Sequence, residues 1–86
     1  MPGMPAPMRI TVQYDETLQK ITGTAEEPMW MGEGGTFVFA LESIFMGHPD
    51  IEKTYPPGKL GFLLSGSLPK PHSLLFDGDT IRVCVT

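Results

Sequence analysis

The chain has 86 residues, which is enough for one hydrophobic core and too few for two. Its hydrophobic content of 41% and charged content of 19% are typical of a folded domain. A net charge of -4 with no cluster of basic residues excludes a nucleic-acid partner. The sequence has neither a membrane-spanning apolar run nor a secretion signal, so we expect a cytoplasmic protein without a membrane partner.

Cysteine and histidine content indicates neither a disulfide scaffold nor a zinc site. Cys84 is the only cysteine, and His48 and His72 lie in separate segments without the spacing of zinc ligands. The chain also offers no nucleophile accompanied by a base and by a residue that orients this base. We therefore expect no metal, no cofactor, no catalytic residue and no enzymatic activity.

The first predicted elements are an arm and a strand. Residues 1–7 contain three prolines and a glycine, which favours a loose arm ahead of a single domain over residues 8–86. Apolar side chains then alternate with polar ones, and one face of this segment carries Met8, Ile10, Val12 and Tyr14. The alternation predicts a half-buried strand over residues 8–14.

A second strand is predicted around Trp30, after a polar connection over residues 15–27. Met29 and Met31 share one parity, which leaves Trp30 on the opposite face of the strand. We therefore expect the indole on the sheet face that points away from the helix.

A helix is predicted to begin after Thr36. The Thr36 hydroxyl is a good N-cap because it can accept a hydrogen bond from a free backbone N–H of the first turn. A core-facing stripe with helical spacing follows, made of Phe37, Ala40, Leu41 and Ile44. Phe39 and Phe45 lie beside this stripe, and we expect each ring to pack in the core or under a loop such as residues 54–58.

Two further strands are predicted in the second half of the chain. Gly47 and Pro49 end the helix, and residues 50–58 form a proline-rich crossing loop. The third strand alternates Leu60, Phe62 and Leu64 with Gly61 and Leu63. After a turn at residues 77–79, the last strand alternates Ile81, Val83 and Val85 with Arg82, Cys84 and Thr86.

The order strand, strand, helix, strand, strand predicts an α+β fold. A hairpin, a crossing helix and a returning strand can pair the two terminal strands in the middle of a mixed sheet of four to five strands. The main helix then packs on one face, and the other face meets solvent. This arrangement is a ubiquitin-like β-grasp.

Four short motifs are informative as an ordered set: ITG at residues 21–23, Gly-Thr at 35–36, HP at 48–49 and LLFDGD at 74–79. In this order the chain resembles the sulfur-carrier branch of β-grasp proteins over residues 8–85. The small subunit of molybdopterin synthase and the thiamine-pathway carrier typify that branch. The resemblance implies docking onto a protein partner, either an activating enzyme or a larger synthase subunit. It also implies a C-terminal diglycine that is adenylated and converted to a sulfur-donating thiocarboxylate.

The diglycine itself is absent, because the sequence ends in Val85 and Thr86, and none of its ten glycines follows Gly78. Two interpretations stay open. The chain is a non-carrier interaction or regulatory subunit of an enzyme complex that has lost the tail, or the native chain continues to Gly-Gly and carries sulfur. Under both, the protein acts by docking rather than through an active site.

Candidate partner-contact residues lie on the sheet face opposite the helix. Parity places Trp30 and Leu63 on that face, where together they are expected to form an apolar patch, with Arg82 as a charged contact. Cys84 and Thr86 share the parity of Arg82 and complete the candidate interface. The alternatives are that the N-terminal arm covers the patch, or that a bulge in the second strand inverts its parity.

Overall fold

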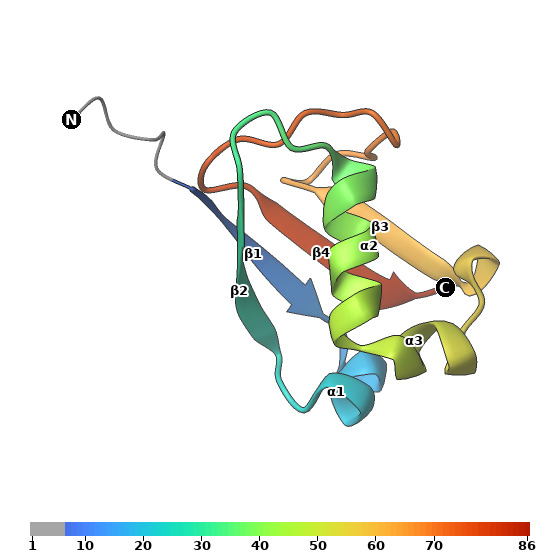
Figure 1. The fold of residues 1–86 in the computed structure, drawn as a ribbon. Coiled ribbons are helices and arrows are strands. Elements are labelled where there is room, and N and C mark those ends of the chain that lie inside the picture. Colours follow the sequence, from blue (N-terminus) through green and yellow to red (C-terminus); the bar gives the residue numbers. More distant parts are fainter. Residues whose placement is uncertain (1–6) are drawn as a thin grey trace.

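The structure, a computed structural model, describes residues 7–86 and contains one sheet with helices packed on one side (Figure 1). Its elements are β1 (Met8–Tyr14), α1 (Glu16–Thr22), β2 (Glu26–Met31), α2 (Phe37–Gly47), α3 (Pro49–Thr54), the 3-10 turn η1 (Pro57–Lys59), β3 (Leu60–Leu64) and β4 (Thr80–Val85). Within residues 7–86 no helix has both the length and the apolar character needed to cross a membrane. Residues 1–6 lie outside the described part of the chain, so the loose arm over residues 1–7 stays a prediction.

The strand order is β2-β1-β4-β3, so the first and last strands form the centre of the sheet. β1 and β4 run parallel, whereas β2 pairs antiparallel with β1 and β3 pairs antiparallel with β4. α2 crosses one face of this sheet (Figure 1). The predicted α+β fold is confirmed as a ubiquitin-like β-grasp with a four-stranded mixed sheet and one main helix.

The segment between the first two strands is a short helix, where the sequence predicted only a polar connection. Asp15 begins α1, because its Oδ1 accepts a hydrogen bond from the Leu18 N–H at 2.8 Å. Gly23 ends it with a left-handed φ of 77°, which glycine adopts without steric cost. Leu18 is the only buried side chain of α1, so the sequence shows no apolar stripe.

Pro49 also differs from its predicted role. It begins α3 instead of ending the helical region, because a proline at the first helical position loses no hydrogen bond and already has a helical φ. The expected crossing loop therefore contains a short helix of six residues, and the buried Ile51 anchors it to the core.

The hydrophobic core lies between the sheet and the helices. Its fully buried members include Ile10, Val12, Leu18, Ala40, Ile51, Ile81 and Val83. Phe37 of α2 meets Phe62 of β3 edge to face, with 5.7 Å between the ring centres. Leu75 also belongs to the core with 2% exposure, although no helix or strand contains it.

Residues 65–79, which join β3 to β4, contain no helix or strand and run across the start of α2 (Figure 1). The Phe37 N–H donates to the Ser73 carbonyl at 2.8 Å, and the Val38 N–H donates to the Pro71 carbonyl at 3.0 Å. These carbonyls satisfy N–H groups of the first helical turn, which have no partner within the helix. The segment is therefore built into the fold at this end.

Candidate functional site

The open face is the sheet face opposite α2, and register assigns to it Arg9, Thr11, Gln13, Glu26, Pro28, Trp30, Gly61, Leu63, Thr80, Arg82 and Cys84. Trp30 is 61% exposed there, whereas the next residue along β2, Met31, is 6% exposed. β2 pairs with β1 residue by residue from Glu26 to Met31, without a bulge that would invert the parity. Trp30 thus points away from the core, as the alternation predicted.

Trp30 stands opposite Arg9 of β1. The guanidinium carbon of Arg9 lies 5.9 Å from the centre of the indole ring, which is a cation–π distance. Sequence reasoning missed Arg9, because its contact with Trp30 depends on the register between the two strands. The alternation in residues 8–14 indicates only that Arg9 points outward.

Leu63 lies on the same face but not beside Trp30, so the predicted apolar patch is wrong. β2 and β3 are the two edges of the sheet, separated by three strand spacings of about 4.8 Å each, roughly 14 Å in all. Polar residues of β1 and β4, among them Thr11 and Thr80, lie between them. Leu63 is half-buried and faces Arg82 across the β3–β4 ladder. Parity gives only the face on which a side chain lies, whereas the predicted pairing of the two terminal strands already places the second and third strands at opposite edges.

The other candidate residues lie toward the β3 side of the open face. Arg82 is exposed and available for contact. Cys84 is half-buried, and its Sγ lies 3.5 Å from the Gly61 carbonyl, which accepts its weak hydrogen bond. Thr86 is exposed at the end of β4. The structure therefore brings Leu63 and Arg82 together and leaves Trp30 with Arg9.

Charge on the open face differs in sign from the charge of the whole chain. The chain has a net charge of -4, yet both of its arginines, Arg9 and Arg82, lie on this face, with Glu26 as its only carboxylate. Within residues 7–86 neither guanidinium forms an ion pair. Two guanidinium groups are thus available to a carboxylate from outside.

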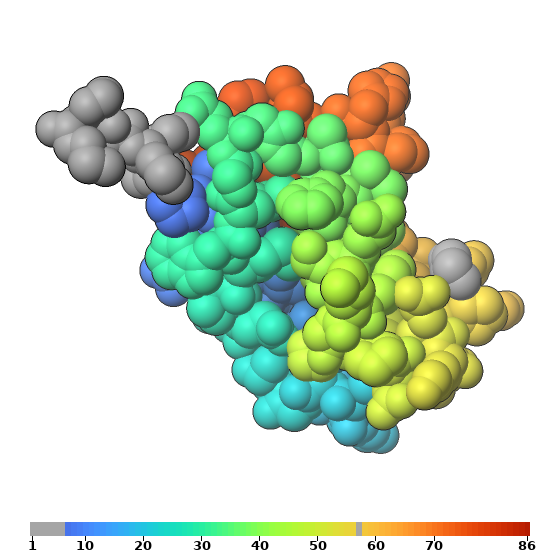
Figure 2. Space-filling model, viewed as in Figure 1, coloured from blue at the N-terminus to red at the C-terminus, as the bar shows by residue number. Residues whose placement is uncertain are grey.

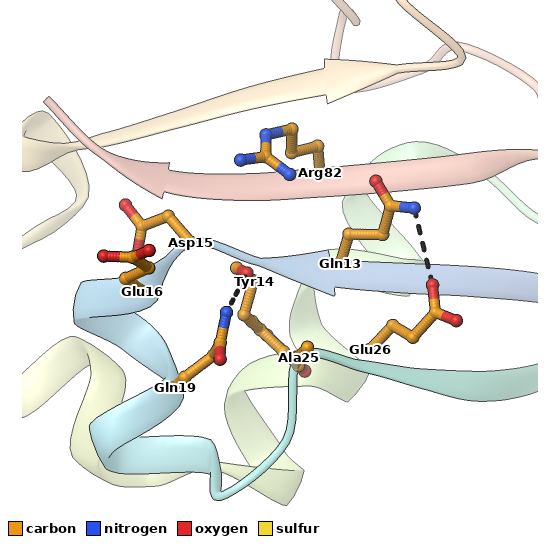
Figure 3. A pocket seen from close by; sticks show the side chains of 8 residues that line it. All are labelled: Gln13, Tyr14, Asp15, Glu16, Gln19, Ala25, Glu26 and Arg82. Atoms are coloured by element: carbon orange, nitrogen blue, oxygen red, sulfur yellow. Dashed lines mark hydrogen bonds between the residues drawn. The ribbon is translucent and has the colours of Figure 1, made fainter.

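A shallow hollow of about 360 Å³ borders the open face where β1 ends (Figure 3). It is lined mostly by residues with polar side chains, namely Gln13, Tyr14, Asp15, Glu16, Gln19, Glu26 and Arg82, together with Ala25. The Gln19 Nε2 donates to the Tyr14 carbonyl at 3.1 Å, and the Gln13 Nε2 donates to Glu26 Oε2 at 3.4 Å. These groups bind one another, and the hollow lacks the apolar enclosure of a typical small-molecule site.

Asp15 holds the end of β4 in place. Its Oδ2 accepts the Val85 N–H at 2.7 Å, while its other oxygen caps α1. On the opposite side the Thr86 N–H donates to the Lys59 carbonyl at 2.9 Å. Hydrogen bonds to an ionised carboxylate are stronger than those between neutral groups. The end of β4 is therefore held from both sides, by Asp15 and by the Lys59 carbonyl.

A second polar cluster lies on the helix side of the sheet. His48 Nε2 lies 2.7 Å from Glu27 Oε2. The His48 and Tyr14 rings pack edge to face, with 5.7 Å between the ring centres. Burial, followed by the charge of Glu27, raises the pKa of the Tyr14 hydroxyl far above its usual value. Sequence reasoning missed this pair, because His48 and Glu27 lie far apart in the sequence and meet only in the fold. The cluster fastens the junction of α2 and α3 to β2.

No metal site is apparent within residues 7–86, where no group of three or more histidine, cysteine, aspartate or glutamate side chains is placed to hold an ion. Asp77 and Asp79, which flank Gly78, bind backbone groups instead. Asp77 Oδ1 accepts the Arg9 N–H, and Asp79 Oδ2 accepts the Phe76 N–H, each at 2.8 Å. These carboxylates therefore act as turn residues.

Neither a protein-family model nor a curated protein matches the sequence. The fold is nevertheless well represented among solved structures. A putative molybdopterin converting factor subunit 1 from Pyrococcus furiosus superimposes with a TM-score of 0.79 at 21% identity, covering 91% of this chain and 97% of that chain. Small archaeal modifier protein 1 from H. volcanii superimposes with a TM-score of 0.78 at 14% identity, again covering 91% of this chain and 97% of that chain. Small archaeal modifier protein 1 from Methanosarcina acetivorans superimposes with a TM-score of 0.71 at 20% identity, covering 92% of this chain and 93% of that chain.

These likenesses define the class of fold. The chain has the small β-grasp found in molybdopterin converting factor subunits and in archaeal ubiquitin-like modifiers. A structure named as a ubiquitin from Caldiarchaeum subterraneum shares it with a TM-score of 0.61 at 14% identity. At these identities the similarity concerns the fold, so function rests on the surfaces of this chain.

Proposed function

We propose that this protein is a small ubiquitin-like carrier or modifier that acts by docking onto a protein partner, without an active site of its own. The exposed Trp30 with the Arg9 guanidinium over its ring, on the sheet face opposite α2, is the observation that carries the proposal. Tryptophan and arginine are the side chains most enriched among residues that dominate interface binding energy. The solved structures that share the fold include proteins named as modifiers and as a converting-factor subunit, which supports the same class.

The partner surface that suits the open face carries carboxylates around an apolar centre. A carboxylate binds a guanidinium through two parallel hydrogen bonds, and Arg9 and Arg82 have no carboxylate partner within residues 7–86. Trp30 and Leu63 add apolar contacts at two separate corners. Such a partner would bury about 800 Å² of this chain. An activating enzyme or a larger synthase subunit is the expected candidate.

Sulfur transfer is the finer part of the proposal and applies if the native chain continues to Gly-Gly. A tail attached after Thr86 would leave the domain at the end of β4, at the point that Asp15 and the Lys59 carbonyl hold. Its terminal carboxylate would be adenylated in the partner's site and converted to a thiocarboxylate. The alternative is an interaction or regulatory subunit that docks by the same face.

The intact mass of the protein isolated from its own cells, with its C-terminal peptide sequenced, separates these two functions. A carrier extends to Gly-Gly, and part of the population is heavier by the difference between sulfur and oxygen. A chain that ends at Thr86 excludes the carrier function and leaves the interaction subunit.

Docking itself is tested by purifying a tagged chain from its own cells together with its bound protein. We expect a stoichiometric partner that is lost in Trp30→Ala and kept in Met46→Ala, a matched control because Met46 is 82% exposed on α2. If Trp30→Ala unfolds the domain, Trp30 is a core residue and the proposed docking face is wrong.

A further inference from the structure

Several large apolar side chains remain exposed at the end of the molecule where α2 begins. Val38 is 41% exposed, Phe39 52%, Leu68 84%, Leu74 54% and Phe76 65%. We call this set the apolar end. None of these residues belongs to the open face described above.

Backbone contacts bring the apolar end together from two parts of the chain. The Val38 N–H donates to the Pro71 carbonyl at 3.0 Å, and Leu74 forms a β-bridge with Thr36. Figure 2 shows the orange atoms of this segment lying against the green start of α2 at one end of the molecule. Residues 71–75 therefore lie against the start of α2, and Leu68 and Phe76 flank this contact along the chain.

The exposure follows from how residues 65–79 are anchored. Leu75 points into the core with 2% exposure, so its neighbours Leu74 and Phe76 point outward. Phe39 lies on the side of α2 away from the core stripe. The expectation that a loop over residues 54–58 covers Phe39 is wrong, because that loop follows α3 at the other end of α2.

The exposed apolar area matches what a dimer interface needs. With about 200 Å² for a phenylalanine and somewhat less for leucine and valine, the exposed fractions correspond to roughly 500 Å². A standard interface buries about 800 Å² on each side, and homodimer interfaces are about 65% apolar, so each copy needs about 500 Å² of apolar surface. The largest apolar patch on a typical soluble monomer covers about 300–600 Å² and is often functional, so an area of this size is a reasonable binding surface.

Charge favours a second copy of this chain as the occupant. In a two-fold contact each copy presents the same surface, so like charges at its centre repel. The five side chains of the apolar end carry no charge, and the nearby Lys70 and Asp77 have opposite signs. The open face is less suited to self-contact, because Arg9 and Arg82 are both positive.

We propose that the apolar end is a self-association surface through which two copies of this chain form a two-fold dimer. This surface is additional to the proposed docking face and does not depend on it. A dimer formed here leaves Arg82, which pairs with Gln13 at the far end of β1, free for another partner.

Sedimentation velocity of the full chain over a range of concentrations tests the proposal. We expect a monomer–dimer equilibrium in the wild type. Leu68→Ser combined with Phe76→Ser weakens dimerisation at least tenfold, because each removes a large apolar contact. Met46→Ser, which changes an equally exposed methionine at the other end of α2, leaves the equilibrium unchanged.

Three results would overturn the proposal. They are a wild type that stays monomeric at every concentration, a dimer that the double variant does not weaken, and a dimer that Met46→Ser weakens to the same extent. Circular dichroism and thermal unfolding check that each variant folds. Leu68→Ser alone, at the most exposed position of the set, replaces the double variant if that variant does not fold.

Discussion

The open face and the apolar end differ in how the fold positions their side chains. On the open face, strand alternation and register fix the direction of each residue, and Trp30 faces Arg9 for this reason. At the apolar end, residues 65–79 have no strand or helix, and the buried Leu75 decides which neighbours point outward.

The two surfaces also differ in chemistry. The open face combines guanidinium groups with an indole, which select a partner by charge and by ring geometry. The apolar end offers area without charge, which gives affinity but little selectivity. One small domain can therefore carry two surfaces that suit different partners, and each can be disrupted separately.

Loss of the Leu75 side chain should have the largest effect, because it anchors the apolar end to the core. We expect Leu75→Ala to lower the free energy of unfolding by about 3 kcal/mol, since it removes a fully buried leucine. Urea unfolding measures this change. Leu74→Ala, at the exposed neighbouring position, should change stability by no more than about 0.5 kcal/mol. Equal effects of the two variants would show that Leu75 is not the anchor.

Loss of the Asp15 side chain should have the next largest effect on stability. Asp15 lines the hollow that borders the open face. Asp15→Ala removes the α1 cap and the acceptor of the Val85 N–H, so we expect a loss of about 2 kcal/mol in the free energy of unfolding. Hydrogen exchange of the Val85 amide should become faster. Asp15→Asn keeps one acceptor oxygen and should lie between the wild type and Asp15→Ala. A wild-type exchange rate at Val85 in Asp15→Ala would contradict this role.

Tyr14 tests the core that both surfaces share. Burial raises the pKa of its hydroxyl above the ordinary value of about 10, so the folded state keeps this proton to a higher pH than the unfolded state does. The contribution of Tyr14 to stability is therefore complete below about pH 10 and falls as the pH rises above it.

Urea unfolding at several alkaline pH values measures this loss, and Tyr14→Phe should remove part of it. Near neutral pH we expect Tyr14→Phe to change stability by less than about 1 kcal/mol, because the hydroxyl has no hydrogen-bond partner within residues 7–86. The same alkaline loss in both proteins would assign it to other groups.

Sequence reasoning predicted the parts of the fold that have a clear periodicity. Alternation placed Trp30 outward, and the helical stripe with its Thr36 cap located α2. α1 was missed because a seven-residue helix with one buried side chain, Leu18, has no visible stripe. α3 was missed because proline is common both just after a helix and at the first position of the next one, so Pro49 alone does not distinguish the two.

The candidate site was less predictable because it depends on contacts between distant segments. The separation of Trp30 from Leu63 is an exception, because pairing the terminal strands in the middle of the sheet already places the second and third strands at its edges, and the patch rested on parity alone. The contact of Arg9 with Trp30 follows from the β1–β2 register. The exposure of Leu74 and Phe76 follows from burial of Leu75 between them, in a segment without periodicity.

The central claim, that the open face docks a protein partner, is tested most directly by the affinity of the purified partner for Trp30→Ala. We predict binding at least tenfold weaker than to the wild type, with an unchanged unfolding transition and with wild-type affinity in Met46→Ala. Wild-type affinity in a folded Trp30→Ala variant would contradict the claim and place the contact elsewhere.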